Sequence, residues 1–218
     1  ARIPASGDFT FETWIKVSPK AGNQAICSQY ANSQSGRMIF FVRSSTGTTP
    51  NVISLSISFI SVFGTTVVAD DAWHHVALER SGNNWYLYVD GALDNSGTSS
   101  GSIYTGINTR IGHNRNTAGQ DNPLKGYLSD CRLTTSAVYG GSSYTVPTAP
   151  VSAITNTSIL LNFQDAGIYD RSGINNLDTV GNARLGFAPI YGTGSLAFDG
   201  TGDYLSMPVE PRFDFGTA

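Results

Sequence analysis

The chain has 218 residues, a formal charge of −3 and 13% charged residues, with 24 Gly and 9 Pro. This length and composition fit one large all-β domain better than a helical one. No basic run exceeds two residues and no apolar run reaches the roughly 20 residues that cross a bilayer, so neither nucleic-acid binding nor a membrane span is expected.

Short runs with apolar residues at every second position predict β-strands along the whole chain, and no segment of 10–12 residues keeps a helical period. Clusters of Gly, Asn, Asp, Ser and Pro separate these runs as turns. In chain order the predicted strands cover residues 9–17, 24–30, 37–44, 51–59, 64–69, 73–80, 84–91, 109–114, 124–138, 158–163, 194–200 and 203–208. This spacing is typical of a β-sandwich or jelly roll.

The run NWYLYVDG predicts a central strand, because both of its faces carry bulky side chains. Trp85, Leu87 and Val89 share one face, and Tyr86 and Tyr88 share the other. A strand covered on both faces is expected in the middle of a sheet in a two-layer fold.

Two cysteines, Cys27 and Cys131, lie within predicted strands. They are either two small buried residues or one disulfide between neighbouring strands, and the sequence leaves both alternatives open.

Five segments together resemble the laminin-G-like branch of the concanavalin A-like lectin/glucanase superfamily. They are FTFETWIKV, WHHVALERSGNNWYLYVDG, TRIGHN, LKGYLSDCRLTTSAVY and SLAFDGTGDYLSMP. The resemblance implies an all-β, antiparallel two-sheet β-sandwich of the jelly-roll type. The run ILLNFQDAGIYDRSGINNLDTVGNA after YTVPTAPV looks like modules, often in tandem, of phage and other virion structural proteins. That narrower likeness implies a location on an extracellular surface or a virion.

The order of these segments is shifted relative to the family pattern, because FTFETW lies near the start while LLNF, DRSG and FDGTGDYL come last. We expect residues 1–150 to form the main body of a sandwich and residues 151–218 to supply the opening strands of a laminin-G-like repeat. Whether residues 159–218 complete this sandwich or a neighbouring subunit or repeat stays open. Since exposed sheet edges invite pairing with another chain, other copies of the chain or adjacent repeats are expected partners.

The acidic residues do not form the pair that glycoside hydrolysis needs. Glu12, Glu79 and Glu210 lie far apart in the sequence, whereas the glucanase branch of the resembled superfamily carries clustered acids on one strand. The neighbours Asp70 and Asp71 would point to opposite sides of a strand. We therefore assign no catalytic residues and expect a protein that is not an enzyme.

The resemblance also implies a structural calcium ion, which many family members hold with Asp carboxylates and backbone carbonyls of loops. The candidate ligands by matching motif are Asp130, Asp170, Asp199 and Asp203. The alternative is that each of these residues caps its own turn. No other cofactor is expected.

Glycan binding would need exposed aromatic rings beside polar side chains that bind hydroxyl groups. The loops YANSQSGR, GHNRNTAGQDN and YGGSSY offer such residues, and the alternative is that they are solvated polar loops. The candidate glycan-binding residues are Tyr30, His113, Asn114, Arg115, Asn116, Gln120 and Asp121.

Two functions from different classes follow. The first is a non-enzymatic structural or adhesion module of a surface-exposed fibre, filament or virion protein, which assembles with neighbouring copies. The alternative is a carbohydrate-binding, lectin-like domain that recognises host glycans, weakly at each site and multivalently.

Overall fold

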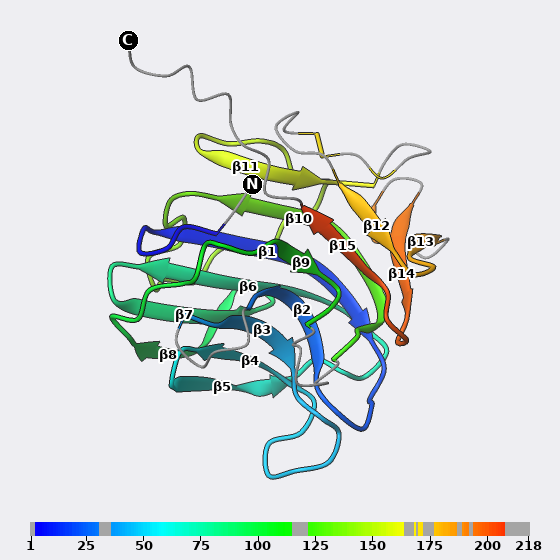
Figure 1. Cartoon of the computed structure of the whole chain (residues 1–218), viewed down its shortest axis with the longest axis horizontal. Coiled ribbons are helices and arrows are strands. Elements are labelled where there is room, and N and C mark those ends of the chain that lie inside the picture. Colours follow the sequence, from blue (N-terminus) through cyan, green and yellow to red (C-terminus); the bar gives the residue numbers. More distant parts are fainter. Residues whose placement is uncertain are drawn as a thin grey trace.

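The computed structural model describes residues 3–30, 36–114, 122–163, 168, 170–171, 177–186, 189–191 and 194–207. These residues form two antiparallel sheets that pack face to face, and none of them is helical (Figure 1). The predicted all-β, two-sheet sandwich is therefore confirmed. A search of the same residues for an apolar helix long enough to span a bilayer finds none.

The first sheet, called here the β1 sheet, is built around the long strand that carries FTFETWIKV. In spatial order its strands are β13 (Arg184–Gly186), β14 (Ser195–Asp199), β10 (Lys125–Thr134), β1 (Phe9–Val17), β6 (Trp73–Ser81), β7 (Asn84–Val89) and β8 (Ala92–Thr98). A further strand, β11 (Thr157–Leu161), pairs with the second half of β10.

The second sheet, called the β2 sheet, contains shorter strands. In spatial order they are β12 (Asp178–Val180), β15 (Tyr204–Met207), β9 (Thr109–Ile111), β2 (Gln24–Gln29), β3 (Met38–Val42), β4 (Val52–Ile57) and β5 (Ile60–Val67). The sequence predicted strands over 51–59 and 64–69, but the chain already reverses at Ser58, whose φ is 48°. No glycine or proline marks this turn, so the sequence pattern placed it too late.

Strands from the C-terminal third of the chain pair with strands from its middle. β14 pairs with the first half of β10, with Leu196 opposite Leu128, and β15 pairs with β9, with Leu205 opposite Ile111 (Figure 1). Within this one chain the C-terminal strands thus lie against the main body, and whether they complete this sandwich or that of a neighbouring copy or repeat stays a prediction.

The hydrophobic core lies between the two sheets. Phe9 and Trp85 pack edge to face within the β1 sheet at 5.8 Å between ring centroids, and Phe11 reaches Phe40 of the β2 sheet at 6.4 Å. The alternation predicted for NWYLYVDG is confirmed, because Trp85 and Leu87 are buried in this core. The inner faces of both sheets are therefore filled by this core, so a binding site would lie on one of the outer faces, those turned away from the core.

Candidate functional site

A buried polar cluster lies on the outer face of the β1 sheet. The alternation of β1 and β6 sends Glu12 and Glu79 to this face, and the register places Thr10 opposite Glu79 and Glu12 opposite Ala77. The two carboxylates are therefore diagonal neighbours on adjacent strands. Their side chains are 1% and 0% exposed, because residues 136–151, here called the crossing segment, run over them.

Backbone amides of the crossing segment hold Glu79. Its carboxylate accepts hydrogen bonds from the N–H groups of Val138, Tyr139 and Gly140 at 2.7, 2.6 and 2.6 Å. The hydroxyl of Thr10 donates a fourth bond at 2.9 Å. Three successive N–H groups around one carboxylate form an anion-binding nest, so the buried charge is fully solvated by the protein itself.

Charged and aromatic side chains hold Glu12. Arg132 donates to Oε1 from Nε at 2.8 Å and from Nη2 at 2.5 Å, and the Tyr139 hydroxyl donates to Oε2 at 2.7 Å. His75 Nε2 lies 3.3 Å from Oε2. Burial raises the pKa of Glu12, but the contact with the His75 ring and the charge of Arg132 outweigh it, so the net pKa lies below its usual value.

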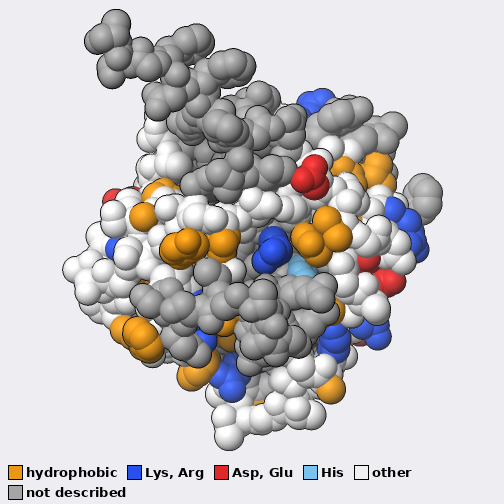
Figure 2. All heavy atoms as spheres, viewed as in Figure 1, with side chains coloured by type: hydrophobic (Ala, Val, Ile, Leu, Met, Phe, Trp, Pro, Cys, Tyr) orange, Lys and Arg blue, Asp and Glu red, His pale blue; other side chains and the backbone are white. Residues whose placement is uncertain are grey.

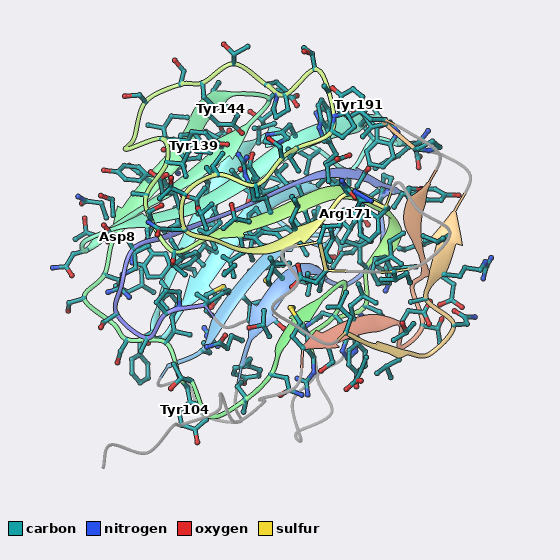
Figure 3. All side chains as sticks on the ribbon, turned by 90° about the horizontal axis from the view of Figure 1, so that it is seen from above. Asp8, Tyr104, Tyr139, Tyr144, Arg171 and Tyr191 are labelled. Carbon is teal, nitrogen blue, oxygen red and sulfur yellow. The ribbon has the colours of Figure 1, made fainter. Side chains whose placement is uncertain are left out.

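The sequence did not predict this pair, because it arises from the register of β1 with β6. Both carboxylates are covered, and each is occupied in fixing the crossing segment. Figure 3 shows Tyr139 and Tyr144 of that segment side by side, and their rings stack at 3.8 Å. Tyr144 donates or accepts a 2.7 Å hydrogen bond at His75 Nδ1, which closes the cluster from above. The arrangement supports a structural role for all these groups.

Two of the four calcium candidates lie together, in the turn between β14 and β15. Asp203 accepts from the N–H groups of Asn182 and Asp199 at 2.7 and 3.0 Å. Asp199 accepts from Thr201 N–H and from the Asn182 side chain at 2.7 and 3.0 Å. The Asn182 amide first and the Thr201 N–H second lower the pKa of Asp199, so it is ionised at neutral pH.

The other two candidates lie apart from that turn. Asp130 sits in an irregularity of β10 with a φ of 55°, accepts from the Ser129 hydroxyl at 2.7 Å and from Val151 N–H at 3.2 Å, and has a pKa that burial raises. Asp170 accepts from Leu160 N–H at 3.0 Å. Within the described ranges, no three His, Cys, Asp or Glu side chains gather as a metal site would need. Calcium binding therefore stays a prediction, confined to the Asp199–Asp203 turn.

The glycan-binding candidates that the structure describes are Tyr30, His113 and Asn114, and all three are buried. Arg115, Asn116, Gln120 and Asp121 lie outside the described residues. The Ser28 hydroxyl donates to the carbonyl of His113 at 2.8 Å, which fixes the chain just after β9. The side-chain oxygen Oδ1 of Asn114 is buried and finds no hydrogen-bond donor among the residues described. A buried acceptor of this kind is costly unless something else supplies a donor.

His113 forms the base of an aromatic site on the outer face of the β2 sheet. The ring of Tyr204 stacks on it at 4.7 Å with an interplanar angle of 12°, and the guanidinium of Arg110 lies 5.6 Å from the centroid of the Tyr204 ring. The alternation of β15 sends Leu205 into the core and Tyr204 outward, where it stays partly exposed. We call Arg110, His113 and Tyr204 the ring platform.

The sequence singled out only His113 of these three residues. The alternation in DYLSM does place Tyr204 opposite to Leu205, but the pairing of β15 with β9 joins segments about ninety residues apart in the chain and could not be derived locally. Figure 2 shows the face over β9 and β15, where hydrophobic, basic and histidine side chains gather. This surface has the residue types that a sugar-binding site uses: an aromatic ring, a guanidinium and amide and hydroxyl groups.

The comparisons with known proteins agree with this fold. Residues 1–139 match the model of a family described as the concanavalin A-like lectin/glucanases superfamily. No curated protein sequence matches significantly. Among solved structures, a protein of Bacteroides ovatus that is provisionally described as carbohydrate binding aligns with a TM-score of 0.55 and 16% identity over 95% of this chain. The alignment spans only 55% of the Bacteroides chain.

Two further structures contain sugars. The CBM40 module of the Ruminococcus gnavus IT-sialidase, bound to α2,3-sialyllactose, aligns with a TM-score of 0.53 and 12% identity over 62% of this chain and 80% of the module. The leech intramolecular trans-sialidase, complexed with 2,7-anhydro-Neu5Ac, aligns with a TM-score of 0.52 and 15% identity over 62% of this chain and 22% of the enzyme. At these identities the likeness concerns the fold alone.

Proposed function

The chain belongs to the concanavalin A-like lectin/glucanases superfamily, and from this premise we propose that it is a non-enzymatic, lectin-like module that binds carbohydrate. The observation that carries the proposal is the ring platform, where Tyr204 stacks on His113 beside Arg110. The sugar-bound state of two proteins with a similar fold supports the same class of ligand. The non-enzymatic part rests on Glu12 and Glu79, whose carboxylates are occupied by the crossing segment.

In this proposal a sugar ring lies against the exposed part of Tyr204, since an aromatic ring offers an apolar surface to the C–H groups of a pyranose. Arg110, which is partly exposed, donates hydrogen bonds to ring hydroxyls. Ser206 lies opposite Arg110 in the β15–β9 register and places a hydroxyl group beside it. Binding at one such site is weak, and several copies on one particle bind tightly.

A glycan array probed with fluorescently labelled wild-type protein, with calcium present, tests the function. For a glycan that is retained, we expect Tyr204→Ala and Arg110→Gln each to weaken binding about ten-fold or more, the loss expected for a charged hydrogen bond or a stacked ring. Tyr104→Ala is the matched control, because Tyr104 is a tyrosine that is 50% exposed and makes none of the ring contacts of the platform; Figure 3 shows it at the edge of the molecule. An array without any binder, or a Tyr204→Ala protein that binds like the wild type, would contradict the proposal.

We further propose that the module belongs to a fibre, filament or virion protein on an extracellular surface, and that its copies assemble by sharing C-terminal strands. What supports this is the topology: β14 and β15 join the main body through β10 and β9, and both follow the residues that match the family model. The same ladders could form between copies, because antiparallel pairing does not depend on which chain supplies the strand.

Light scattering during size-exclusion chromatography tests assembly. Strand sharing predicts species larger than the 23.2 kDa chain that grow with protein concentration. A single 23.2 kDa species at every concentration would sink strand sharing and leave sugar binding untouched.

Calcium binding is proposed for the Asp199–Asp203 turn, where two carboxylates already lie together. Calcium takes about six to eight oxygen ligands, so backbone carbonyls or further side chains would complete the site. EGTA should lower the melting temperature by several degrees relative to excess calcium, with magnesium as the control ion. An unchanged melting temperature would contradict calcium binding at this turn.

A further inference from the structure

A hollow of about 260 Å³ opens on the outer face of the β1 sheet, the sheet opposite to the ring platform. It lies where β10 pairs with β14 and β14 pairs with β13. The side chains that shape it are those of Ser18, Lys125, Tyr127, Arg184, Ala197 and Asp199. None of these residues takes part in the ring platform or in the buried carboxylate cluster.

The register explains why the surface is hollow at this point. Tyr127 of β10, Ala197 of β14 and Arg184 of β13 lie in one row across three adjacent strands. Residues in one row of a sheet point to the same face, so the small methyl group of Ala197 lies between a ring and a guanidinium. Ala197 forms the floor, and Tyr127 and Arg184 form the two walls.

The next row closes one end of the hollow with charged groups. Lys125 lies opposite Asp199, two residues along from Tyr127 and Ala197 and therefore on the same face. The carboxylate of Asp199 already accepts hydrogen bonds from Asn182 and Thr201. The hollow therefore carries two cations, Lys125 and Arg184, beside the Asp199 carboxylate, which is already engaged, and the Asp71 carboxylate that lies behind Ser18.

Ser18 completes the lining with a hydroxyl of fixed orientation. Its Oγ donates a short hydrogen bond to the carboxylate of Asp71, so the oxygen is left as an acceptor. The hollow thus offers an aromatic wall, two cationic donors and one hydroxyl acceptor within one small volume. Pockets for drug-sized ligands measure roughly 300–1,000 Å³, so this one has room for about a single sugar ring.

We propose that this hollow is a binding site for a carboxylate-bearing sugar residue, a uronate. Arg184 takes the carboxylate, Lys125 adds the second positive charge, and the ring of Tyr127 lies along the apolar side of the sugar. Neutral sugars lack the group that the two cations select, so the site discriminates by charge. The proposal is independent of the ring platform, and either site can exist without the other.

Isothermal titration of the whole chain with glucuronate and with glucose tests the site. We expect glucuronate to bind at least ten-fold more tightly than glucose, and Arg184→Gln to weaken glucuronate binding about ten-fold. Ala197→Leu fills the floor without removing a charge and should weaken binding by at least as much. Raising the salt concentration should also weaken it, because the cations are exposed.

Two control variants separate this site from others. Arg43→Gln removes an arginine that lies over Phe63, at the far strand of the β2 sheet, and should leave glucuronate binding unchanged. Tyr204→Ala should also leave it unchanged, since the ring platform lies on the other sheet. Circular dichroism and the melting temperature of Ala197→Leu should match those of the wild type, which checks that this variant is folded. Arg184 is exposed, so Arg184→Gln tests the site without depending on that check.

Several results would overturn the proposal. They are equal affinity for glucose and glucuronate, full retention of glucuronate binding by Arg184→Gln, and loss of that binding in Tyr204→Ala. Competition by sulfate at the same concentration as glucuronate would also overturn it, because the site would then select an anion and not a sugar.

Discussion

Glu12 and Glu79 are both buried on one sheet face, and they are stabilised in different ways. Glu79 takes its hydrogen bonds mainly from backbone N–H groups, whereas Glu12 is neutralised by the guanidinium of Arg132. Neither way of stabilising a buried carboxylate can be read from the sequence, where Glu12 and Glu79 are two isolated acidic residues near apolar residues. Buried charges survive only when they are paired or hydrogen-bonded, so the crossing segment is a condition for the folding of this face.

The lowered pKa of Glu12 predicts a loss of stability in acid. A carboxylate whose pKa is lower in the folded state contributes stability above its usual pKa of 4.5, and this contribution disappears as the pH falls through the folded value. We therefore expect the free energy of unfolding to decrease steadily below about pH 4.5. Urea unfolding followed by tryptophan fluorescence at a series of pH values measures it.

Two variants make this test specific. Glu12→Gln should cost about 3 kcal/mol at neutral pH, because it leaves Arg132 without its charged partner, and should flatten the loss in acid. Asp130, whose pKa burial raises, contributes with the opposite sign, so Asp130→Asn should make the acid loss steeper or leave it unchanged. An acid profile of Glu12→Gln that parallels the wild type would show that other carboxylates dominate.

At the scale of single elements, the two edge strands β5 and β8 are fastened to one another. Asp94 of β8 accepts hydrogen bonds from the N–H groups and hydroxyls of both Thr65 and Thr66 of β5, at 2.7 to 3.0 Å. These strands end the two different sheets, so the contact closes one side of the sandwich. Phe59 and Phe63 are nevertheless 79% and 43% exposed at this edge, which leaves an apolar strand that needs protection.

Asp94→Ala should loosen β5 without unfolding the central strands. Four hydrogen bonds to one carboxylate are lost, and we expect a cost of about 1–2 kcal/mol because the site is partly exposed. Hydrogen exchange read by mass spectrometry should show faster exchange in residues 60–67 and unchanged exchange in β1 and β10. Asp178→Ala, an exposed aspartate in the edge strand β12, is the control; equal exchange of β5 in both variants would refute the role of Asp94.

At the scale of the whole molecule, Cys27 and Cys131 are two thiols buried in the core between the sheets. They come from the two different sheets, both are free, and they are 1% and 0% exposed. Burial raises the pKa of Cys131 to about 12 and that of Cys27 further, so both remain protonated thiols at physiological pH. A thiol is a poor nucleophile compared with a thiolate, so both groups are protected from thiol reagents by their burial and by their protonation.

Labelling by a thiol reagent should therefore report global unfolding. At about pH 8 and without denaturant, we expect reaction with dithiobisnitrobenzoate to be slow and to accelerate with urea in step with loss of tryptophan fluorescence. Cys27→Ala and Cys131→Ala assign each rate to one residue. Rapid reaction of either thiol in the native protein would contradict this packing.

The fold could be predicted from the sequence because the alternation of apolar and polar residues is a local pattern that recurs in many strands. The alternation within FTFETWIKV and NWYLYVDG predicted strands that the structure confirms as β1 and β7, and the five family-like segments predicted the sandwich. The strands β8, β12 and β13 and the turn at Ser58 were missed, because the polar run ALDNSGT and the two three-residue strands carry little apolar alternation and this turn lacks glycine.

The candidate sites were harder to predict, because each combines residues that lie far apart in the chain. Tyr204 meets His113, Glu12 meets Arg132, and Arg184 faces Tyr127 across Ala197 only through pairings between distant strands. Register is set by the whole sheet and not by a motif, so a local reading could name His113 without its partners.

Two of the three tryptophans lie on opposite faces of the β1 sheet, and once Trp73 is replaced by phenylalanine they give the protein an internal optical assay. Trp85 lies in the core, where its Nε1 donates to the Ser99 carbonyl at 3.1 Å, whereas Trp14 lies on the outer face against His75 and Tyr191. Tyr191 in turn donates to Pro147 of the crossing segment. Emission from Trp14 should thus shift when that segment lifts, while emission from Trp85 should shift only when the sheets separate. The two emission shifts would then follow the lifting of the crossing segment and the separation of the two sheets separately, whereas a single melting curve does not distinguish these two steps.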